Sequence, residues 1–218
     1  CVCAVMPSSA FALDRTQLAV IVNTQDPLSV QIGGYYAQRR QILFQNIIKV
    51  SFPPGRTTLT REEFEAMKAQ VDKQTPQYVQ AYALTWAAPY RVECLSITTA
   101  FAFGFNAGFC ADGCKPTRPS PYFNSPSRLP FTQLRMRPTM AIAATSIEHA
   151  KALIDRGVES DGSFPVGTAY LLSTSDNARN VRSLLYPQVE EMLKGRLRVR
   201  RLEQDALMDE ADVLFYFT

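Results

Sequence analysis

Cysteine and histidine are the side chains of this chain that could carry nucleophilic or metal chemistry. The 218 residues hold five cysteines and one histidine. Catalysis by a cysteine or serine nucleophile needs a base within hydrogen-bond reach, about 2.6–3.2 Å. The single histidine, His149, follows Ser146 by three residues, and Ser146 is well placed to cap a helix. We therefore expect His149 on a helix surface, and no catalytic residue is predicted within this chain.

The spacing of the cysteines favours a disulfide over a metal site. If Cys1 and Cys3 are removed with a signal peptide, then Cys94, Cys110 and Cys114 remain. Cys110 and Cys114 flank a glycine-containing turn, and we expect their Cα atoms within about 7 Å of each other, close enough for a disulfide. Zinc is the alternative, but a structural zinc site needs four ligands. No metal and no cofactor is therefore predicted, and the partner of Cys94 is left open.

A second set of candidate residues follows the apolar runs of the sequence. Ligands of open parallel sheets bind beyond the carboxyl ends of the strands. The polar and aromatic residues at these positions, which we predict as binding residues, are Asn23, Asp26, Thr85, Trp86, Ser173 and Asp176. The alternative is that such groups cap the helices that follow, for which Asp26, Ser146 and Asp176 are suitably placed.

Several classes of ligand are disfavoured by what the chain lacks. No Gly-x-Gly-x-x-Gly follows the first apolar run, and no phosphate-binding loop with Gly-Lys-Ser/Thr occurs, so dinucleotide and P-loop nucleotide binding are not expected. The net charge is +3, and no basic cluster is interleaved with aromatic residues, so a nucleic-acid partner is not expected. No apolar run reaches the roughly 18 residues of a membrane span.

Arginines alternate near the end of the chain. Arg196, Arg198 and Arg200 would share one face of a strand, with Arg201 beside them. They could meet an acidic partner. The alternative is a solvated edge strand that its charges protect from aggregation.

Alternating strands and helices are predicted to position these residues. The apolar runs predict strands at 18–23, 46–52, 78–86, 140–145, 168–174, 197–202 and 213–218. Helical patterns lie at 27–40, 60–74, 146–156 and 177–194, and a short helix fits between 94 and 105. Thr60 and Glu63 have the spacing of a capping box. This order implies βαβ crossovers and a three-layer α/β sandwich, with the first five strands in one mainly parallel sheet.

The middle and the N-terminal end of the chain depart from this alternation of strands and helices. Residues 87–138 are rich in proline and glycine and hold three cysteines, so we expect an irregular insertion there. Residues 1–12 carry no charge and end in Ala10-Phe11-Ala12, the pattern that signal peptidase recognises. We predict that 1–12 is the remnant of a signal peptide, that the mature protein begins at Leu13, and that it is exported to the periplasm or beyond the cell. An apolar N-terminal strand is the alternative.

The run at 213–218 resembles a buried strand, and domains seldom stop inside their core. Residues 13–218 are therefore predicted to be the N-terminal part of a single α/β domain that is truncated at its C-terminus.

The sequence also resembles known families. Residues 18–23, 35–40 and 46–48 resemble the start of gingipain-type domains, 76–79 and 84–86 resemble the next strand, and 146–152 a later helix. Residues 83–94, 116–123, 150–157 and 167–182 resemble an uncharacterised bacterial family found in species with exosortase (PEP-CTERM) protein sorting. The second resemblance spans nearly all of residues 13–218.

The resemblance implies a caspase- or gingipain-like fold and two hypotheses of function. In gingipain-like peptidases the catalytic histidine follows a strand that ends in Tyr-x-Gly-His-Gly. The comparable strand here is 213–218, so no catalytic residue carries over, and Cys94 is not at a nucleophile position. The exosortase-associated family continues Phe-Thr-Gly without that histidine. This implies a non-catalytic protein that binds a peptide, protein or glycan of the cell envelope. The alternative is a cysteine endopeptidase whose histidine and cysteine lie beyond residue 218.

Overall fold

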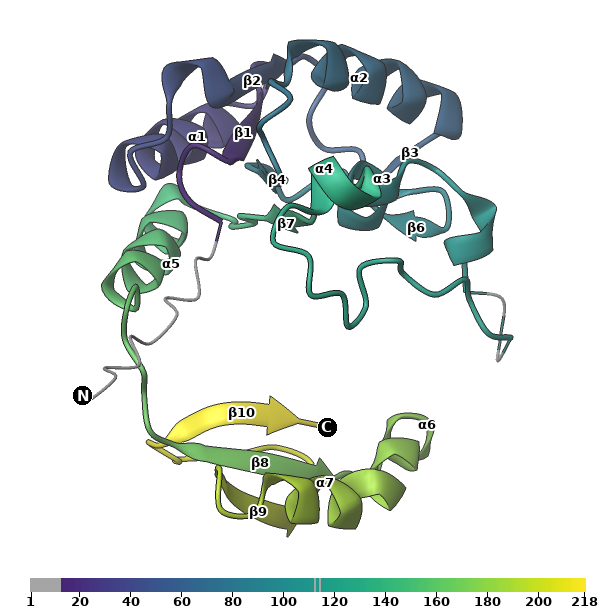
Figure 1. The fold of residues 1–218 in the computed structure, drawn as a ribbon, viewed down its shortest axis with the longest axis vertical. Coiled ribbons are helices and arrows are strands. Elements are labelled where there is room, and N and C mark those ends of the chain that lie inside the picture. Colours follow the sequence, from purple (N-terminus) through teal and green to yellow (C-terminus); the bar gives the residue numbers. More distant parts are fainter. Residues whose placement is uncertain (1–12, 112, 114) are drawn as a thin grey trace, which may run out of the picture. The chain divides into compact units, whose positions relative to one another are not determined.

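The computed structural model describes residues 13–111, 113 and 115–218. The chain divides into two compact units, the first running to Ser160 and the second from Asp161 to Thr218 (Figure 1). The predicted signal-peptide remnant, residues 1–12, and its cleavage site lie outside the described residues. Within the described part, no helix has the length and apolar character needed to cross a bilayer.

Four parallel strands form the central sheet of the first unit, in the order β2-β1-β4-β7. They are β1 (Leu18–Asn23), β2 (Ile47–Val50), β4 (Ala81–Leu84) and β7 (Thr139–Ala141). β1 is central, with Val20 opposite Ile47 on one side and Leu18 opposite Ala81 on the other. The four strands predicted for this half of the chain are therefore confirmed, although β2, β4 and β7 are shorter than predicted.

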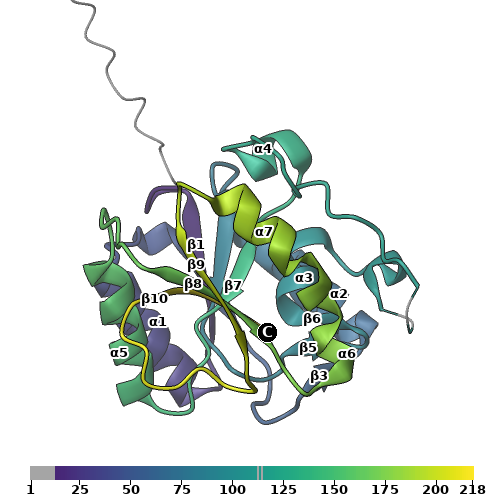
Figure 2. The ribbon, with the colours of Figure 1, turned by 90° about the horizontal axis from the view of Figure 1, so that it is seen from below.

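Helices cover both faces of this sheet. They are α1 (Pro27–Arg39), α2 (Arg61–Gln74), α3 (Ile97–Phe103) and α5 (Ile147–Glu159). Phe64 of α2 and Phe101 of α3 pack edge to face and join a core that includes Tyr82 of β4. On the opposite face, α1 and α5 lie side by side (Figure 2), and Ile32 and Ile154 are buried with Ala83. The first unit is thus an α/β structure with a helical layer on each face of a parallel sheet.

The helix starts follow the predicted caps. Asp26 Oδ1 accepts a hydrogen bond from Leu28 N–H at 3.0 Å at the start of α1, where Pro27 takes the first helical position. Thr60 and Glu63 form the predicted capping box of α2, and Ser146 caps α5. Each cap satisfies backbone donors that the first turn of a helix leaves unpaired.

Glu63 is expected to make the cap of α2 sensitive to acid. Its carboxylate accepts hydrogen bonds from Arg56 at 2.5 and 2.9 Å and from Thr60 N–H at 2.9 Å, and these lower the pKa of Glu63 to about 2. Because the folded pKa lies below the unfolded value of about 4.3, this stabilisation is complete above that pH and is lost as the pH falls toward 2.

The free energy of unfolding of Glu63→Gln should therefore differ most from that of the wild type near neutral pH. The difference should shrink between about pH 5 and pH 2, which denaturant titrations at several pH values would measure. Glu62→Gln is the matched control, because the Glu62 carboxylate accepts no hydrogen bond from a described residue. A pH-independent difference for Glu63→Gln would contradict the prediction.

Alanine substitutions at two adjacent glycines of α1 are expected to have opposite effects on the free energy of unfolding. A Cβ atom on Gly33 would lie 2.5 Å from Cγ2 of Val22, because α1 approaches β1 closely there. A Cβ atom on Gly34 would meet nothing within 4 Å. We expect Gly33→Ala to destabilise the chain by about 1–3 kcal/mol through overpacking. Gly34→Ala should stabilise it by roughly 0.5–1 kcal/mol through helix propensity. Thermal unfolding of both variants tests the pair, and equal effects would contradict it.

Where the structure describes it, the predicted irregular insertion at 87–138 forms short elements. They are β5 (Arg91–Val92), β6 (Leu95–Ser96), the short helix α3, the 3-10 turn η2 (Ala107–Phe109) and α4 (Pro130–Leu134). β5 and β6 pair antiparallel, and β5 also pairs with β3 (Thr58–Leu59) in parallel. Another 3-10 turn, η1 (Phe44–Asn46), precedes β2.

The second unit holds a separate parallel sheet in the order β10-β8-β9. Its strands are β8 (Thr168–Ser173), β9 (Arg198–Glu203) and β10 (Val213–Phe217). The predicted strands are confirmed. β8 is paired along both edges, by β9 and by β10, so 168–174 pairs directly with none of the first four strands, and the single sheet predicted for all five stays a prediction.

The helix predicted at 177–194 is divided in the second unit. It consists of α6 (Asn177–Asn180), the 3-10 segment η3 (Val181–Leu185) and α7 (Tyr186–Leu193). Pro187 lies in the first turn of α7. A proline is tolerated there but would remove a hydrogen bond inside a continuous helix, so the division occurs next to it.

Candidate functional site

Asn23 and Thr85, two predicted binding residues, lie at the carboxyl edge of the first sheet and are fully buried. Asn23 Oδ1 accepts hydrogen bonds from Gln25 N–H and Phe52 N–H, both at 3.2 Å, and its Nδ2 donates to the Phe52 carbonyl at 2.9 Å. The amide thus fastens the segment after β2 to the end of β1. All three interactions are internal to the fold.

Thr85 belongs to a chain of buried hydrogen bonds at the same edge. Its hydroxyl donates to the Ile21 carbonyl at 3.0 Å and lies 2.7 Å from the Ser29 hydroxyl, which accepts from Asn23 N–H at 3.0 Å. Since the Thr85 hydroxyl donates to the carbonyl, it accepts the hydrogen bond from the Ser29 hydroxyl. Every member therefore has a partner, and the network joins β1, β4 and α1 where an open sheet would bind a ligand.

The other two residues predicted at this edge also serve the fold. Asp26 is the cap of α1, as the capping alternative predicted. Trp86 is 2% exposed, donates from Nε1 to the Pro89 carbonyl at 3.2 Å, and packs edge to face on Phe52 and Phe101. The structure brings the four residues of this edge together, but it uses them for packing and capping.

Ser173 and Asp176 lie in the second unit, after β8. The Ser173 carbonyl accepts from Gln204 N–H at 3.0 Å, and Asp176 Oδ1 accepts from Ala178 N–H at 3.1 Å at the start of α6. Between them, Ser175 donates its N–H and hydroxyl to Asp205, at 2.6 and 2.9 Å, which lowers the pKa of Asp205. This turn is therefore held by capping and by a serine–carboxylate bond.

The arginines of β9 meet carboxylates of their own unit. Arg198 contacts Asp212 at 3.3 Å, Arg200 contacts Glu210 at 2.9 Å, and Arg201 contacts Glu190 at 2.8 Å. Tyr170 of β8 donates to Asp212 and Glu210, at 2.7 and 2.8 Å, and the Asp212 bond is the main cause that raises the pKa of Tyr170 to about 12. The acidic groups that the arginine row could meet are thus supplied by the chain itself.

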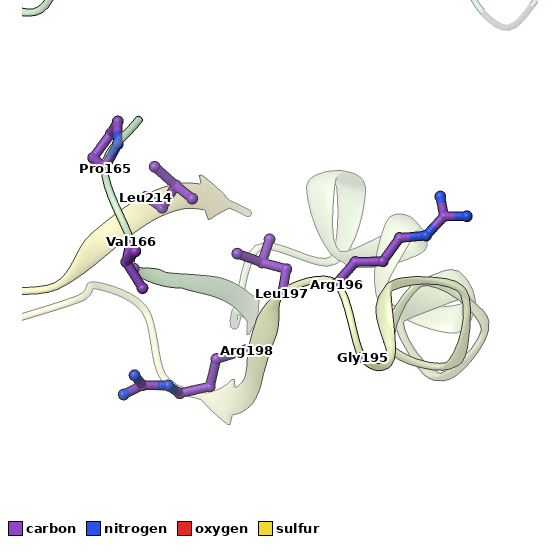
Figure 3. A pocket seen from close by; sticks show the side chains of 8 residues that line it. Pro165, Val166, Gly195, Arg196, Leu197, Arg198 and Leu214 are labelled. Atoms are coloured by element: carbon purple, nitrogen blue, oxygen red, sulfur yellow. The ribbon is translucent and has the colours of Figure 1, made fainter. Parts of the chain in front are cut away.

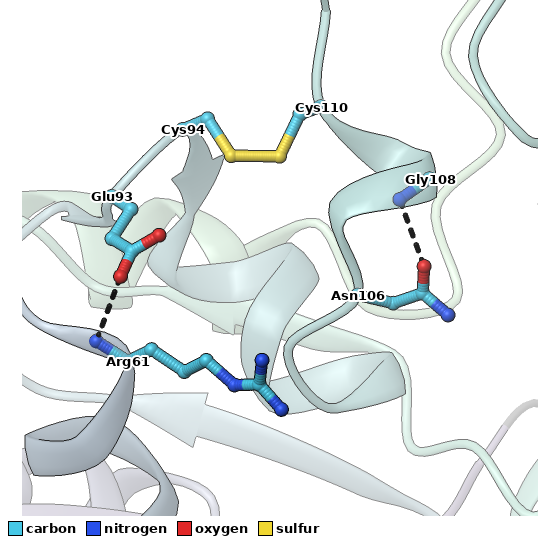
Figure 4. The surroundings of a disulfide bond; sticks show 6 residues. All are labelled: Arg61, Glu93, Cys94, Asn106, Gly108 and Cys110. Carbon is cyan, nitrogen blue, oxygen red and sulfur yellow. Dashed lines mark hydrogen bonds between the residues drawn. A yellow bond between two sulfur atoms is a disulfide. The ribbon is translucent and has the colours of Figure 1, made fainter.

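Cys110 forms a disulfide with Cys94, with Cα atoms 5.5 Å apart (Figure 4). The sequence predicted Cys114 as the partner of Cys110, and Cys114 lies outside the described residues. The bond to Cys94 corrects that pairing. The turn between β5 and β6 brings Cys94 to η2. In Figure 4, Glu93 of that turn accepts from Arg61 N–H at 3.3 Å, and Asn106 Oδ1 accepts from Gly108 N–H at 2.8 Å. Within the insertion, the disulfide thereby ties the end of η2 to the turn between β5 and β6.

His149 is exposed on the first turn of α5, and its N–H donates to the Ser146 hydroxyl at 3.3 Å. The prediction of a helix-surface histidine is confirmed. Among residues 13–111, 113 and 115–218, no three His, Cys, Asp or Glu side chains are grouped so as to hold a metal ion.

A cavity of about 240 Å³ in the first unit gathers charged side chains that the sequence prediction missed. It is lined by Lys68, Asp72, Gln77, Phe101, Ala102, Phe131, Arg135 and Arg137. The Arg137 side chain is 5% exposed, and burial lowers its pKa. Lys68 and Asp72 have the spacing of an ordinary helix-surface pair, and Arg137 lies in an irregular segment. No periodic signal therefore pointed to their convergence.

A larger cavity of about 540 Å³ lies in the second unit at the amino ends of its three strands (Figure 3). Pro165, Val166, Leu197 and Leu214 supply apolar walls. Figure 3 shows that the charged side chains of its lining, on Arg196 and Arg198, extend away from each other. The lining does not focus polar groups on one point, so we place the candidate site at the charged cavity of the first unit.

Comparisons with protein-family models, with curated proteins and with solved structures found no match to this chain.

Proposed function

We propose that this chain is an exported, non-catalytic domain of the cell envelope that binds a peptide or a glycan in an exosortase-linked process, with a caspase- or gingipain-like fold. The parallel sheet of the first unit, with helices on both faces, is compatible with that fold. The resemblance to the exosortase-associated family supports the cellular setting.

The Cys94–Cys110 disulfide is the observation that carries this proposal. A cysteine peptidase needs a free thiolate beside a base, and this bond uses the Cys94 thiol covalently. Disulfides form and persist outside the reducing cytoplasm, so the bond also supports export. The polar groups at the carboxyl edge of the first sheet support the non-catalytic part of the proposal, because they serve as caps and in buried hydrogen bonds rather than as reactive groups.

The test offers the oxidised 218-residue chain to a peptide array and a glycan array, with mass spectrometry of every bound peptide. We expect binding to one of the arrays with no cleavage. A thiol-reactive probe should leave Cys94 unmodified until a reductant is added.

Three variants make the test decisive. Cys110→Ala breaks the disulfide but keeps the Cys94 thiol, whereas Cys94→Ala removes it. Cleavage that survives in Cys110→Ala and disappears in Cys94→Ala and His149→Ala would overturn the proposal, because it would place a catalytic dyad in the chain. Hydrolysis by the natural full-length protein that Cys94→Ala leaves intact would instead favour the endopeptidase hypothesis.

A further inference from the structure

The charged cavity of the first unit has an excess of positive charge that the fold does not neutralise. Lys68, Arg135 and Arg137 are its cations, and Asp72 is its carboxylate. Asp72 is already shared, because Lys68 donates to both of its oxygens at 2.6 and 2.7 Å and Tyr82 donates to Oδ1 at 3.2 Å. One carboxylate therefore faces three cations.

Arg137 is the most deeply buried of these cations, with 5% of its side chain exposed against 17% for Lys68. Its Nε donates to the Val79 carbonyl at 3.0 Å, and its Nη1 lies 3.5 Å from Asp72 Oδ1. The Tyr82 hydroxyl is a further partner of the guanidinium. A guanidinium has five N–H donors, and three partners, Val79, Asp72 and Tyr82, leave donors over for a ligand. An anion in the cavity would complete this set.

The walls of the cavity orient the guanidinium for such a ligand. The Arg137 Cζ atom lies 3.2 Å from the centroid of the Phe131 ring and 5.3 Å from that of Tyr82. A guanidinium that lies flat on an aromatic ring keeps its N–H groups in the plane, where they can bind a planar carboxylate with two parallel hydrogen bonds. Arg135 also lies over Phe131, at 5.6 Å, and forms no ion pair with a described residue.

We infer that this cavity binds the carboxylate of a peptide, between Arg137, Arg135 and Lys68. The inference rests on the proposed function, which it deepens by naming the site and the class of ligand. The volume of about 240 Å³ accommodates a small acidic group, since a water molecule occupies about 30 Å³ in the liquid. The nearby Asp72 favours a monoanion over a dianion, because a carboxylate repels like charge. The carboxylate could be a side chain or a chain terminus.

The test titrates four small probes into the oxidised 218-residue chain. Binding is measured by the shifts of the NMR signals of the arginine Nε–H groups and of residues 68–77. The probes are acetyl-Ala-Glu-Ala-amide, its glutamine counterpart, acetyl-Ala-Ala-Ala with a free carboxylate, and inorganic phosphate. We expect binding of at least one carboxylate peptide, and the side-chain and terminal forms distinguish the two sources. Equal binding of the glutamine peptide, or tighter binding of phosphate, would overturn the inference.

Variants locate the site. Arg137→Gln should abolish binding, but it also removes the bond to Val79, so its fold must be checked. Lys68→Gln and Arg135→Gln alter groups nearer the rim, and the double variant should weaken binding at least tenfold. Lys73→Gln removes one positive charge, as Lys68→Gln does, but from an exposed position of α2 outside the cavity lining, and should leave binding unchanged. Equal weakening by Lys73→Gln would show non-specific attraction and overturn the site.

The outcomes for site and function are distinguishable. If the array ligands bind the Lys68→Gln, Arg135→Gln variant as well as the wild type, this site is wrong and the proposed binding function stands. If the glutamate peptide binds at the cavity but no array ligand binds, the site stands and the proposed envelope function fails.

Discussion

Reduction of the Cys94–Cys110 disulfide is expected to lower the free energy of unfolding by about 3 kcal/mol, the value for a loop of this length. The two cysteines are separated by 16 residues, and the bond closes the segment that contains α3 and η2. Without it, the unfolded chain gains conformational freedom. For a chain of this size we expect the melting temperature to fall by roughly 6–12 °C.

Single serine variants distinguish this pairing from the one predicted from sequence. Cys94→Ser and Cys110→Ser should each reproduce the effect of reductant, and reductant should then add little. Cys114→Ser is the control and should melt like the wild type. A large loss of stability in Cys114→Ser with none in Cys94→Ser would contradict the observed pairing. Digestion without reductant should yield one peptide pair joined through Cys94 and Cys110.

Local signals in the sequence predicted the framework well. The strand 18–23 was predicted with its observed bounds, and the caps at Thr60 and Ser146 were predicted from residue type and spacing alone. Capping by Asp26 was the alternative to its predicted binding role. These features depend on neighbours within a few residues, such as the capping box between Thr60 and Glu63. The frame of the first unit could therefore be predicted without knowledge of distant contacts.

The parts that could not be predicted depend on residues far apart in the chain. Cys94 pairs with Cys110 because the turn between β5 and β6 folds back toward η2, and no periodic pattern marks that turn. Ser29 and Thr85 share a hydrogen bond across 56 residues. Arg137 meets Asp72 because α2 packs beside β4 and the segment before β7. The pairing of β8 with both β9 and β10 likewise joins strands that are distant in the sequence.

The carboxyl edge of the first sheet shows why residue type alone does not separate a binding role from a structural one. Asn23, Thr85 and Trp86 have the chemistry of binding residues at the position where parallel sheets bind ligands. Their exposed fractions are 0, 0 and 2%. The same hydrogen-bonding capacity that would hold a ligand instead closes the edge, and exposure is not readable from a single sequence. A stability measurement separates these two roles.

Asn23→Ala is therefore expected to destabilise the fold strongly instead of only weakening binding. The substitution removes the acceptor of the Gln25 and Phe52 N–H groups and the donor to the Phe52 carbonyl. Asn23 is fully buried and Phe52 is half-buried, so water replaces these bonds incompletely. A buried group that loses its partner costs about 1–3 kcal/mol. We expect a total loss of about 3 kcal/mol in the free energy of unfolding, measured by denaturant titration.

Thr24→Ala is the matched control at the adjacent position. The Thr24 hydroxyl also donates across to the neighbouring strand, to the Val50 carbonyl at 3.1 Å, but the residue is exposed and water can replace it. Its loss should cost less than about 1 kcal/mol. If Asn23→Ala were as stable as Thr24→Ala and lost ligand binding, Asn23 would be a binding residue after all. If it unfolds at lower denaturant concentration, as we expect, the closed edge of this sheet is structural and ligands must be sought elsewhere on the molecule.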